Sequence, residues 1–124
     1  QHGYILGGFT SVPWASQNTD HPDPSAFLFS IVNPSGTPPV KLPVASWSPR
    51  LGGASGVSYA VGHLLHKGPS FGNNTDLAIS DSPNTTSSSS SLQYVFLSPT
   101  GQNQYFLTGS NTFLLSEFEV FVVT

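Results

Sequence analysis

Two histidines offer the simplest metal-binding pattern in this chain. His63 and His66 lie three positions apart, so one turn of helix would present both imidazoles to a single metal ion. Gly62 and Pro69 flank the pair and disfavour a helix, and the adjacent Lys67 would repel a cation. The surrounding motif supplies no third ligand, so we predict no metal centre at this place.

The segment from Asp20 to Asp23 combines two carboxylates with His21, and such a turn could offer oxygen and nitrogen ligands to a cation. Pro22 and Pro24 explain the same residues as an Asp-rich turn. Calcium requires several converging oxygens, and this turn has two carboxylates. We therefore interpret the segment as a turn and not as a calcium site.

Glu117 and Glu119 are separated by one residue, which places both carboxylates on one face of a strand, as in paired-carboxylate chemistry. A solvated strand face explains the pattern without any chemistry. The chain contains neither a Gly-x-Ser-x-Gly nucleophile motif nor a glycine-rich phosphate loop ending in Lys-Ser/Thr. Because no residue combination supports catalysis, we predict a protein that is not an enzyme and needs no cofactor.

Two triplets match the acceptor pattern for N-linked sugar, beginning at Asn73 and at Asn84. Both lie in segments rich in turn-forming residues, where an acceptor would be accessible. The chain has no cysteine, which excludes a disulfide framework and a cysteine-based zinc site. The two acceptors and an abundance of serine and threonine predict an extracellular glycoprotein, with a cytoplasmic protein as the alternative.

Charged residues are scarce in this chain of 124 residues. Lys and Arg number 3 and Asp and Glu 6, so 7% of residues are charged, against about 25% in an ordinary soluble domain. So few cations cannot neutralise a phosphate backbone, which excludes a nucleic-acid-binding module. The net charge of −3 produces little repulsion between copies of the chain. No apolar run reaches the roughly 18 residues that a membrane-spanning helix needs.

The spacing of proline and glycine favours strands over helices, since 11 Pro and 12 Gly are spread along the whole chain. Turn-forming clusters separate short apolar runs, which is typical of an antiparallel sandwich or barrel. We predict an all-β fold, an antiparallel two-sheet β-sandwich with little helix. The predicted strands are residues 4–10, 26–32, 40–44, 57–62, 76–80, 92–98, 104–108 and 113–123.

Four segments carry more specific expectations. Residues 27–32 are apolar at almost every position, which predicts a strand covered on both faces at the centre of the core. In residues 117–123, Phe118, Val120 and Val122 lie on the face opposite the two glutamates, so we expect them on the core side. The five serines at 87–91 are interpreted as a solvated loop. The glycine pair at 7–8 predicts a bulge or a close approach of another residue to the backbone.

Five groups of residues, in order along the chain, resemble motifs of the TLDc domain family. They include a glycine and aromatic segment ending in Ser-x-Pro-Trp, an Asp-Pro-x-Ala-Phe-Leu-Phe-Ser strand, and a Gly-Pro-x-Phe-Gly loop followed by a strand that begins with aspartate. The matching residues are 7–14, 23–30, 68–72 with 76–80, 106–110 and 117–121.

This resemblance implies a sandwich of two antiparallel sheets with small helices, in agreement with the predicted strands. Family proteins are linked to oxidative-stress resistance and, in several members, to regulation of the vacuolar proton-pumping ATPase. The family has no established catalytic residues to transfer. TLDc domains begin further upstream than the segment that matches residues 2–9, so we expect residues 1–124 to form a single domain that lacks the N-terminal part.

The sequence as a whole favours a non-catalytic domain that acts by protein association. Absent upstream strands would leave a sheet edge unpaired, and a neighbouring chain could fill it by strand addition or edge pairing. The expected partner is another copy of the chain or another protein, and contacts that do not close would build a filament. A cytosolic module for oxidative-stress resistance or ATPase regulation is the first alternative, and a glycan-binding module is the second. Trp47 is the candidate contact residue, whereas the resemblance places Trp14 in the core.

Overall fold

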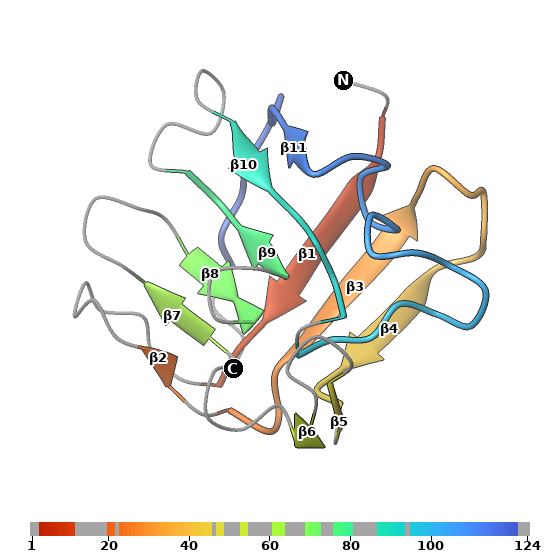
Figure 1. Cartoon of the computed structure of the whole chain (residues 1–124). Helices are drawn as coiled ribbons and strands as arrows, with labels where there is room; N and C mark the ends of the chain where they lie inside the picture. The colour runs from red at the N-terminus through yellow and green to blue at the C-terminus, as the bar shows by residue number, and fades with distance from the viewer. Residues whose placement is uncertain are drawn as a thin grey trace.

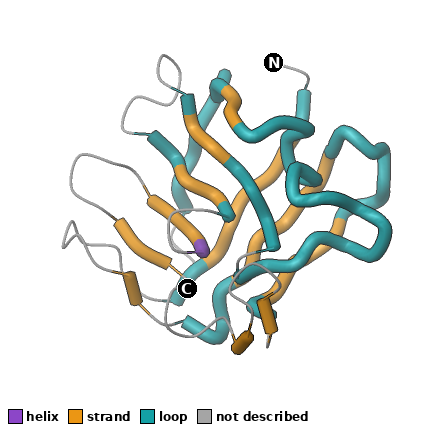
Figure 2. Tube along the Cα trace, in the orientation of Figure 1, coloured by secondary structure: helices purple, strands orange, loops and turns teal. Residues whose placement is uncertain are grey.

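The computed structural model describes residues 3–11, 20–21, 23–45, 47–48, 53–54, 61–63, 69–72, 76–80, 87–93 and 95–121. Strands dominate this part of the chain and helix is almost absent from it (Figure 2). For β2, β5, β6 and β7 the description covers the backbone alone. The strands are β1 (Ile5–Phe9), β2 (Asp20–His21), β3 (Phe27–Val32), β4 (Val40–Pro43), β5 (Trp47–Ser48), β6 (Gly53–Ala54), β7 (Val61–His63), β8 (Pro69–Phe71), β9 (Leu77–Ala78), β10 (Ser88–Ser89) and β11 (Thr112–Phe113).

All pairs of strands are antiparallel. One sheet has the order β1-β3-β4, a second has the order β11-β10-β9-β8-β7-β2, and β5 and β6 form a separate ribbon. Figure 1 shows the three-stranded sheet on one side and strands β7 to β10 fanned out beside it. The prediction of an all-β fold with two antiparallel sheets is therefore confirmed.

The hairpin between β3 and β4 follows directly from its turn residues. Gly36 has a φ of 70°, and its N–H donates to the carbonyl oxygen of Asn33 at 3.1 Å. The Asn33 side chain accepts from the N–H of Thr37 and donates to the carbonyl oxygen of Thr37, both at 3.1 Å. Aromatic and β-branched residues then favour the strand that precedes the turn. These contacts fix the register that pairs Ser30 with Val40.

The core lies between the two large sheets. The first sheet contributes Leu28 and Leu42, and the second contributes Phe71 and Leu77. Phe71 meets Phe96 edge to face, with the ring centroids 6.2 Å apart. The connection between β10 and β11 supplies the other large members of the cluster, which are Leu92, Val95, Phe96, Phe106 and Leu107.

Gly8 shows why the first strand carries two glycines. A Cβ atom added to Gly8 would lie 2.5 Å from Cζ of Phe71, so the aromatic ring from β8 rests directly on the backbone of β1. The predicted close approach is confirmed at this residue. The register irregularity of β1 lies between Ile5 and Leu6, one residue before the glycine pair.

Several predicted strands are wrong. Residues 92–93, 95–98 and 104–108 contain no strand, although Val44 and Phe96 form an isolated bridge. The apolar residues there are buried in turns, in which Gln93 donates to Phe96 and Phe106 donates to Asn103 through the backbone. Of the predicted strand at 113–123, the structure has β11 at Thr112–Phe113 and no strand at 114–121. Residues 122–123 lie outside the described residues.

The expected two-sided burial of β3 is also wrong. Leu28 and Ser30 are buried on the inner face, whereas Phe27 and Phe29 on the outer face are half-buried and Ile31 is exposed. Phe27 stacks on Phe9 at 5.2 Å between ring centroids. The strand is apolar on both faces because its outer face carries this aromatic cluster, not because a second layer covers it.

Candidate interaction surface

Asp23 occupies the predicted turn, and its carboxylate ties two segments together. Thr10 Oγ1 and the N–H of Ser11 donate to Oδ2 at 2.6 and 2.8 Å. Ser11 Oγ and the N–H of Ser25 donate to Oδ1 at 2.8 and 3.1 Å. Asp23 is 1% exposed, so this network joins the end of β1 to the turn that precedes β3.

The structure has a turn after Asp23, where the N–H of Ala26 donates to the carbonyl oxygen of Asp23 at 3.1 Å. Asp20 and His21 form the strand β2 instead, so the prediction of a turn is wrong for these two residues. Both oxygens of Asp23 face N–H and O–H donors, whose positive ends would repel a cation. Among the residues that the structure describes, no group of three potential ligands converges on a metal site. His63 lies in β7 with only its backbone described, and His66 lies outside the described residues.

The same network makes the free energy of unfolding depend on pH. Burial raises the pKa of the Asp23 carboxyl, but hydrogen bonds from Thr10, Ser11 and Ser25 outweigh burial and hold the pKa below its ordinary 3.8. Since the unfolded state binds the proton more readily, the stabilisation is complete above pH 3.8 and is lost as the pH falls through the folded pKa.

We expect Asp23→Asn to lower the free energy of unfolding at pH 7 by about 1–3 kcal/mol. The difference between wild type and variant should shrink as the pH falls below 3.8. Urea unfolding at a series of pH values measures this difference in the free energy of unfolding. Glu117→Gln, at an exposed residue, is the control. A difference in the free energy of unfolding between wild type and Asp23→Asn that stays constant down to pH 2 would contradict the role assigned to the charged carboxylate.

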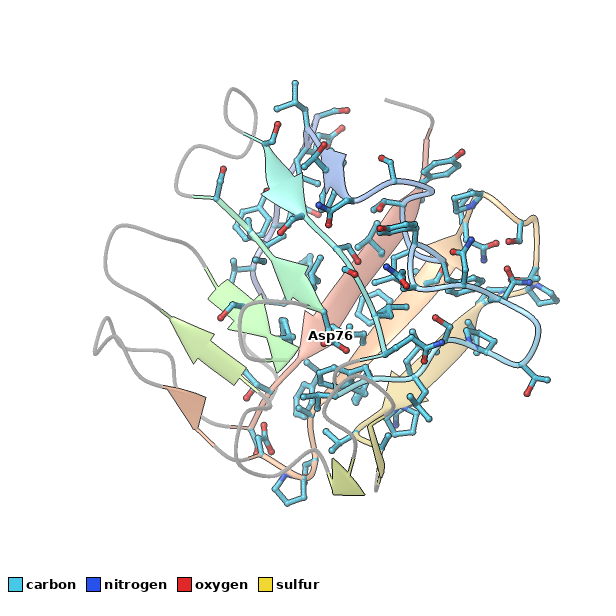
Figure 3. All side chains as sticks on the ribbon, in the orientation of Figure 1. Asp76 is labelled. Carbon is cyan, nitrogen blue, oxygen red and sulfur yellow. The ribbon has the colours of Figure 1, made fainter. Side chains whose placement is uncertain are left out.

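Asp76 is a second buried carboxylate, at the point where β9 begins (Figure 3). Its Oδ2 accepts from the N–H groups of Val95 and Phe96 at 3.0 and 2.7 Å. The carbonyl oxygen of Asp76 accepts from Ser90 Oγ at 2.9 Å. Asp76 thereby holds the connection between β10 and β11 against the second sheet, and its position indicates a structural role.

The serine run was predicted to be a solvated loop, and this prediction is wrong. Residues 88–89 form β10, and Ser88, Ser90 and Ser91 are buried. Ser88 Oγ accepts from the N–H of Ser80 at 3.1 Å. Small hydroxyl side chains fit here because neighbouring backbone groups satisfy them.

The side chains of three candidate site residues are not among those that the structure describes. Asn73 and Asn84, the two candidate glycosylation acceptors, lie outside the described residues. Trp47 begins β5, where its backbone pairs with Ala54. Glycosylation at Asn73 and Asn84 and a contact role for Trp47 remain predictions.

The segment that follows β11 is the most exposed apolar part of the described chain. Phe118 is 46% exposed, Val120 65% and Phe121 76%, and Glu117 and Glu119 are exposed beside them. We call residues 114–121 the C-terminal segment. Phe118 and Val120 were predicted to face the core, and this prediction is wrong because both are exposed; Val122 lies outside the described residues. Leu115, near the start of the segment, is partly buried and packs against the core.

The outer edge of β1 is a second feature, because no described strand pairs with it. In the three-stranded sheet, β1 and β4 are the two edge strands. β4 carries Lys41 and Pro43, both exposed, which are residues that block further strand pairing. β1 reads Ile-Leu-Gly-Gly-Phe and has neither a charge nor a proline. Its edge is therefore chemically open to another strand.

The comparisons with known proteins agree with the fold. Comparison with curated proteins and with solved structures finds no match. In the described part of the chain, no helix has the length and hydrophobicity needed to cross a bilayer. The sequence model of the TLDc domain matches residues 1–124. Because this match spans the entire sequence, the chain belongs to the TLDc domain family, whose domains are generally non-catalytic modules of protein interaction.

Proposed function

We propose that this TLDc domain is non-catalytic and acts by association with copies of itself through the C-terminal segment. The observation that carries the proposal is the exposure of Phe118, Val120 and Phe121 side by side in sequence. Large apolar residues grouped at the surface mark interaction sites more often than isolated ones do. In a period-two pattern Phe118 and Val120 share one side of the segment, and Phe121 follows the two glutamates on the other.

Several properties of the chain support a second copy of the same chain as the partner. Its net charge of −3 and its 7% content of charged residues place little electrostatic repulsion between copies. Lys41, the only cation among the described residues, lies 4.1 Å from the ring centroid of Phe27. A partner recognised through charged rims would need more charge than this surface offers.

The proposal extends to an extracellular glycoprotein, supported by the acceptor triplets at Asn73 and Asn84 and by the weakly charged composition. The intact mass of the native chain, before and after enzymatic removal of N-linked sugar, tests this part. Loss of hexose-sized increments supports it. A constant mass near 13.1 kDa favours the cytoplasmic alternative, a module for oxidative-stress resistance or ATPase regulation.

The outer face of the three-stranded sheet gives no support to glycan binding. Phe27 has Phe9 stacked on its ring and Lys41 above it, so its aromatic surface is already engaged. A sugar would need an open aromatic face, and the candidate for that role is still Trp47.

Sedimentation velocity over a range of concentrations tests self-association. We expect the wild-type chain to sediment faster as its concentration rises, and Val120→Ser/Phe121→Ser to weaken association at least about tenfold, because two large apolar contacts are removed. Ile31→Ser is the matched control, since Ile31 is 47% exposed and lies on the central strand of the other sheet. A wild-type chain that stays monomeric at the highest concentration overturns the proposed function.

A further inference from the structure

The backbone of the C-terminal segment, residues 114–121, accepts and donates no hydrogen bond that links it to another described residue. The segment follows β11 directly, and its residues 117–120 have the period-two alternation of a strand. Exposed N–H and C=O groups beside exposed apolar side chains are suited to pair with the edge of a sheet.

Side-chain area alone would not hold two copies together. At their exposed fractions, Phe118 and Phe121 offer on the order of 200–250 Å² between them, from a typical 200 Å² for each. A stable complex buries about 800 Å² per partner. Main-chain hydrogen bonds from strand addition would supply the missing contact, because each added residue then buries backbone as well as side chain.

Resting on the association proposed above, we propose that the C-terminal segment of one copy adds as a strand to the outer edge of β1 in a second copy, where no described strand pairs. β1 is the longest edge strand in the described chain, with five residues, whereas β2 and β11 at the edges of the other sheet have two each. The other long edge, β4, is blocked by Lys41 and Pro43. Its end is also occupied, since Ala45 donates to the carbonyl oxygen of Val95 at 2.9 Å.

Charge disfavours one alternative, in which two C-terminal segments pair with each other at Phe118. If two such segments paired antiparallel with Phe118 opposite Phe118, Glu117 of each chain would stand opposite Glu119 of the other. Like charges directly opposite each other destabilise a strand pair. β1 has no ionisable side chain, so the glutamates meet no charge there.

This contact joins two different surfaces of the same chain. Two copies that exchange segments reciprocally form a closed dimer, whereas one-way addition builds an open chain of copies. Both arrangements leave the same backbone groups protected, and both depend on concentration.

Hydrogen exchange at low and high concentration tests the proposed pairing. At high concentration, we expect amide exchange to slow at least about tenfold in residues 114–121 and at the outward amides of β1. Glu119→Pro removes one N–H from the segment and should abolish both changes, although that N–H donates to no described residue of the single chain. Glu119→Gln keeps the N–H and should behave as the wild type.

The outcomes separate the pairing from the association itself. If the chain associates and Phe121→Ser prevents it, but Glu119→Pro does not, association stands and strand addition is overturned. Protection of residues 114–121 without protection of β1 assigns the segment to a different edge and also overturns the pairing. Protection of β1 that is already complete at the lowest concentration means that the same chain covers the edge, which overturns it as well.

Discussion

Replacing Asp76 by alanine is expected to lower the free energy of unfolding by about 3–5 kcal/mol. The carboxylate is fully buried and accepts from the N–H groups of Val95 and Phe96. Alanine would leave both donors buried without this acceptor and would open a small cavity beside the core. The connection between β10 and β11 would lose its two bonds to the Asp76 side chain and keep the bond from Ser90 Oγ to the carbonyl oxygen at position 76, so the placement of Phe96 against Phe71 would be weakened.

Urea unfolding followed by circular dichroism measures this effect. A domain of this size has a total stability of about 5–15 kcal/mol, and at the lower end of this range Asp76→Ala leaves too little stability to measure. Asp76→Asn serves as the second variant, since it keeps the volume and one acceptor oxygen and should cost about half as much. Glu117→Ala, at an exposed site, should change stability by less than about 0.5 kcal/mol. A cost below about 1 kcal/mol for Asp76→Ala would show that the carboxylate does not hold the connection.

The strands that sequence patterns predict well are those fixed by local chemistry. β1, β3 and β4 lie within the predicted ranges, because aromatic and β-branched residues favour strands and Asn33 and Gly36 specify the turn between β3 and β4. The hairpin needs no distant contact to define its register.

The strand predictions fail where residues are buried without pairing to another strand. Residues 95–97 are apolar enough to read as a strand, but hydrophobicity indicates burial and does not specify a hydrogen-bonding partner. Here the partner of two N–H groups is a side chain, that of Asp76, from a distant point in the sequence. Likewise, the burial of Ser90 depends on the carbonyl oxygen of Asp76, and no local pattern in a run of serines reveals such a partner.

The interaction surface illustrates the same limit. The alternation of Phe118 and Val120 with glutamates correctly indicates an apolar face, but a period-two pattern cannot tell whether that face is covered by its own chain or by a partner. In the structure these residues are exposed. The pattern that predicted a core therefore identifies a surface available for assembly, and the open edge of β1 becomes visible only once the sheet order is known.

Gly72→Ala is expected to have the second largest effect on the free energy of unfolding, because glycine meets two requirements at this position that alanine cannot. Its φ is 70°, a left-handed conformation that costs a residue with a Cβ atom about 1–2 kcal/mol. A Cβ atom at Gly72 would also overlap the Asp76 carboxylate, lying 2.5 Å from its Cγ. Overpacking of this kind adds about 1–3 kcal/mol, so Gly72→Ala should cost about 2–5 kcal/mol in total.

A matched glycine separates the two contributions. Gly36 has the same φ of 70°, but nothing lies within 4 Å of an added Cβ atom there. Gly36→Ala should therefore cost only the backbone contribution, and the excess at Gly72 measures the overlap with Asp76. The double variant Gly72→Ala/Asp76→Ala should be less destabilised than the sum of the single variants, by about 1–3 kcal/mol, because the overlap disappears with the carboxylate. Strict additivity in urea unfolding would mean that the β8 turn and the buried carboxylate do not constrain each other.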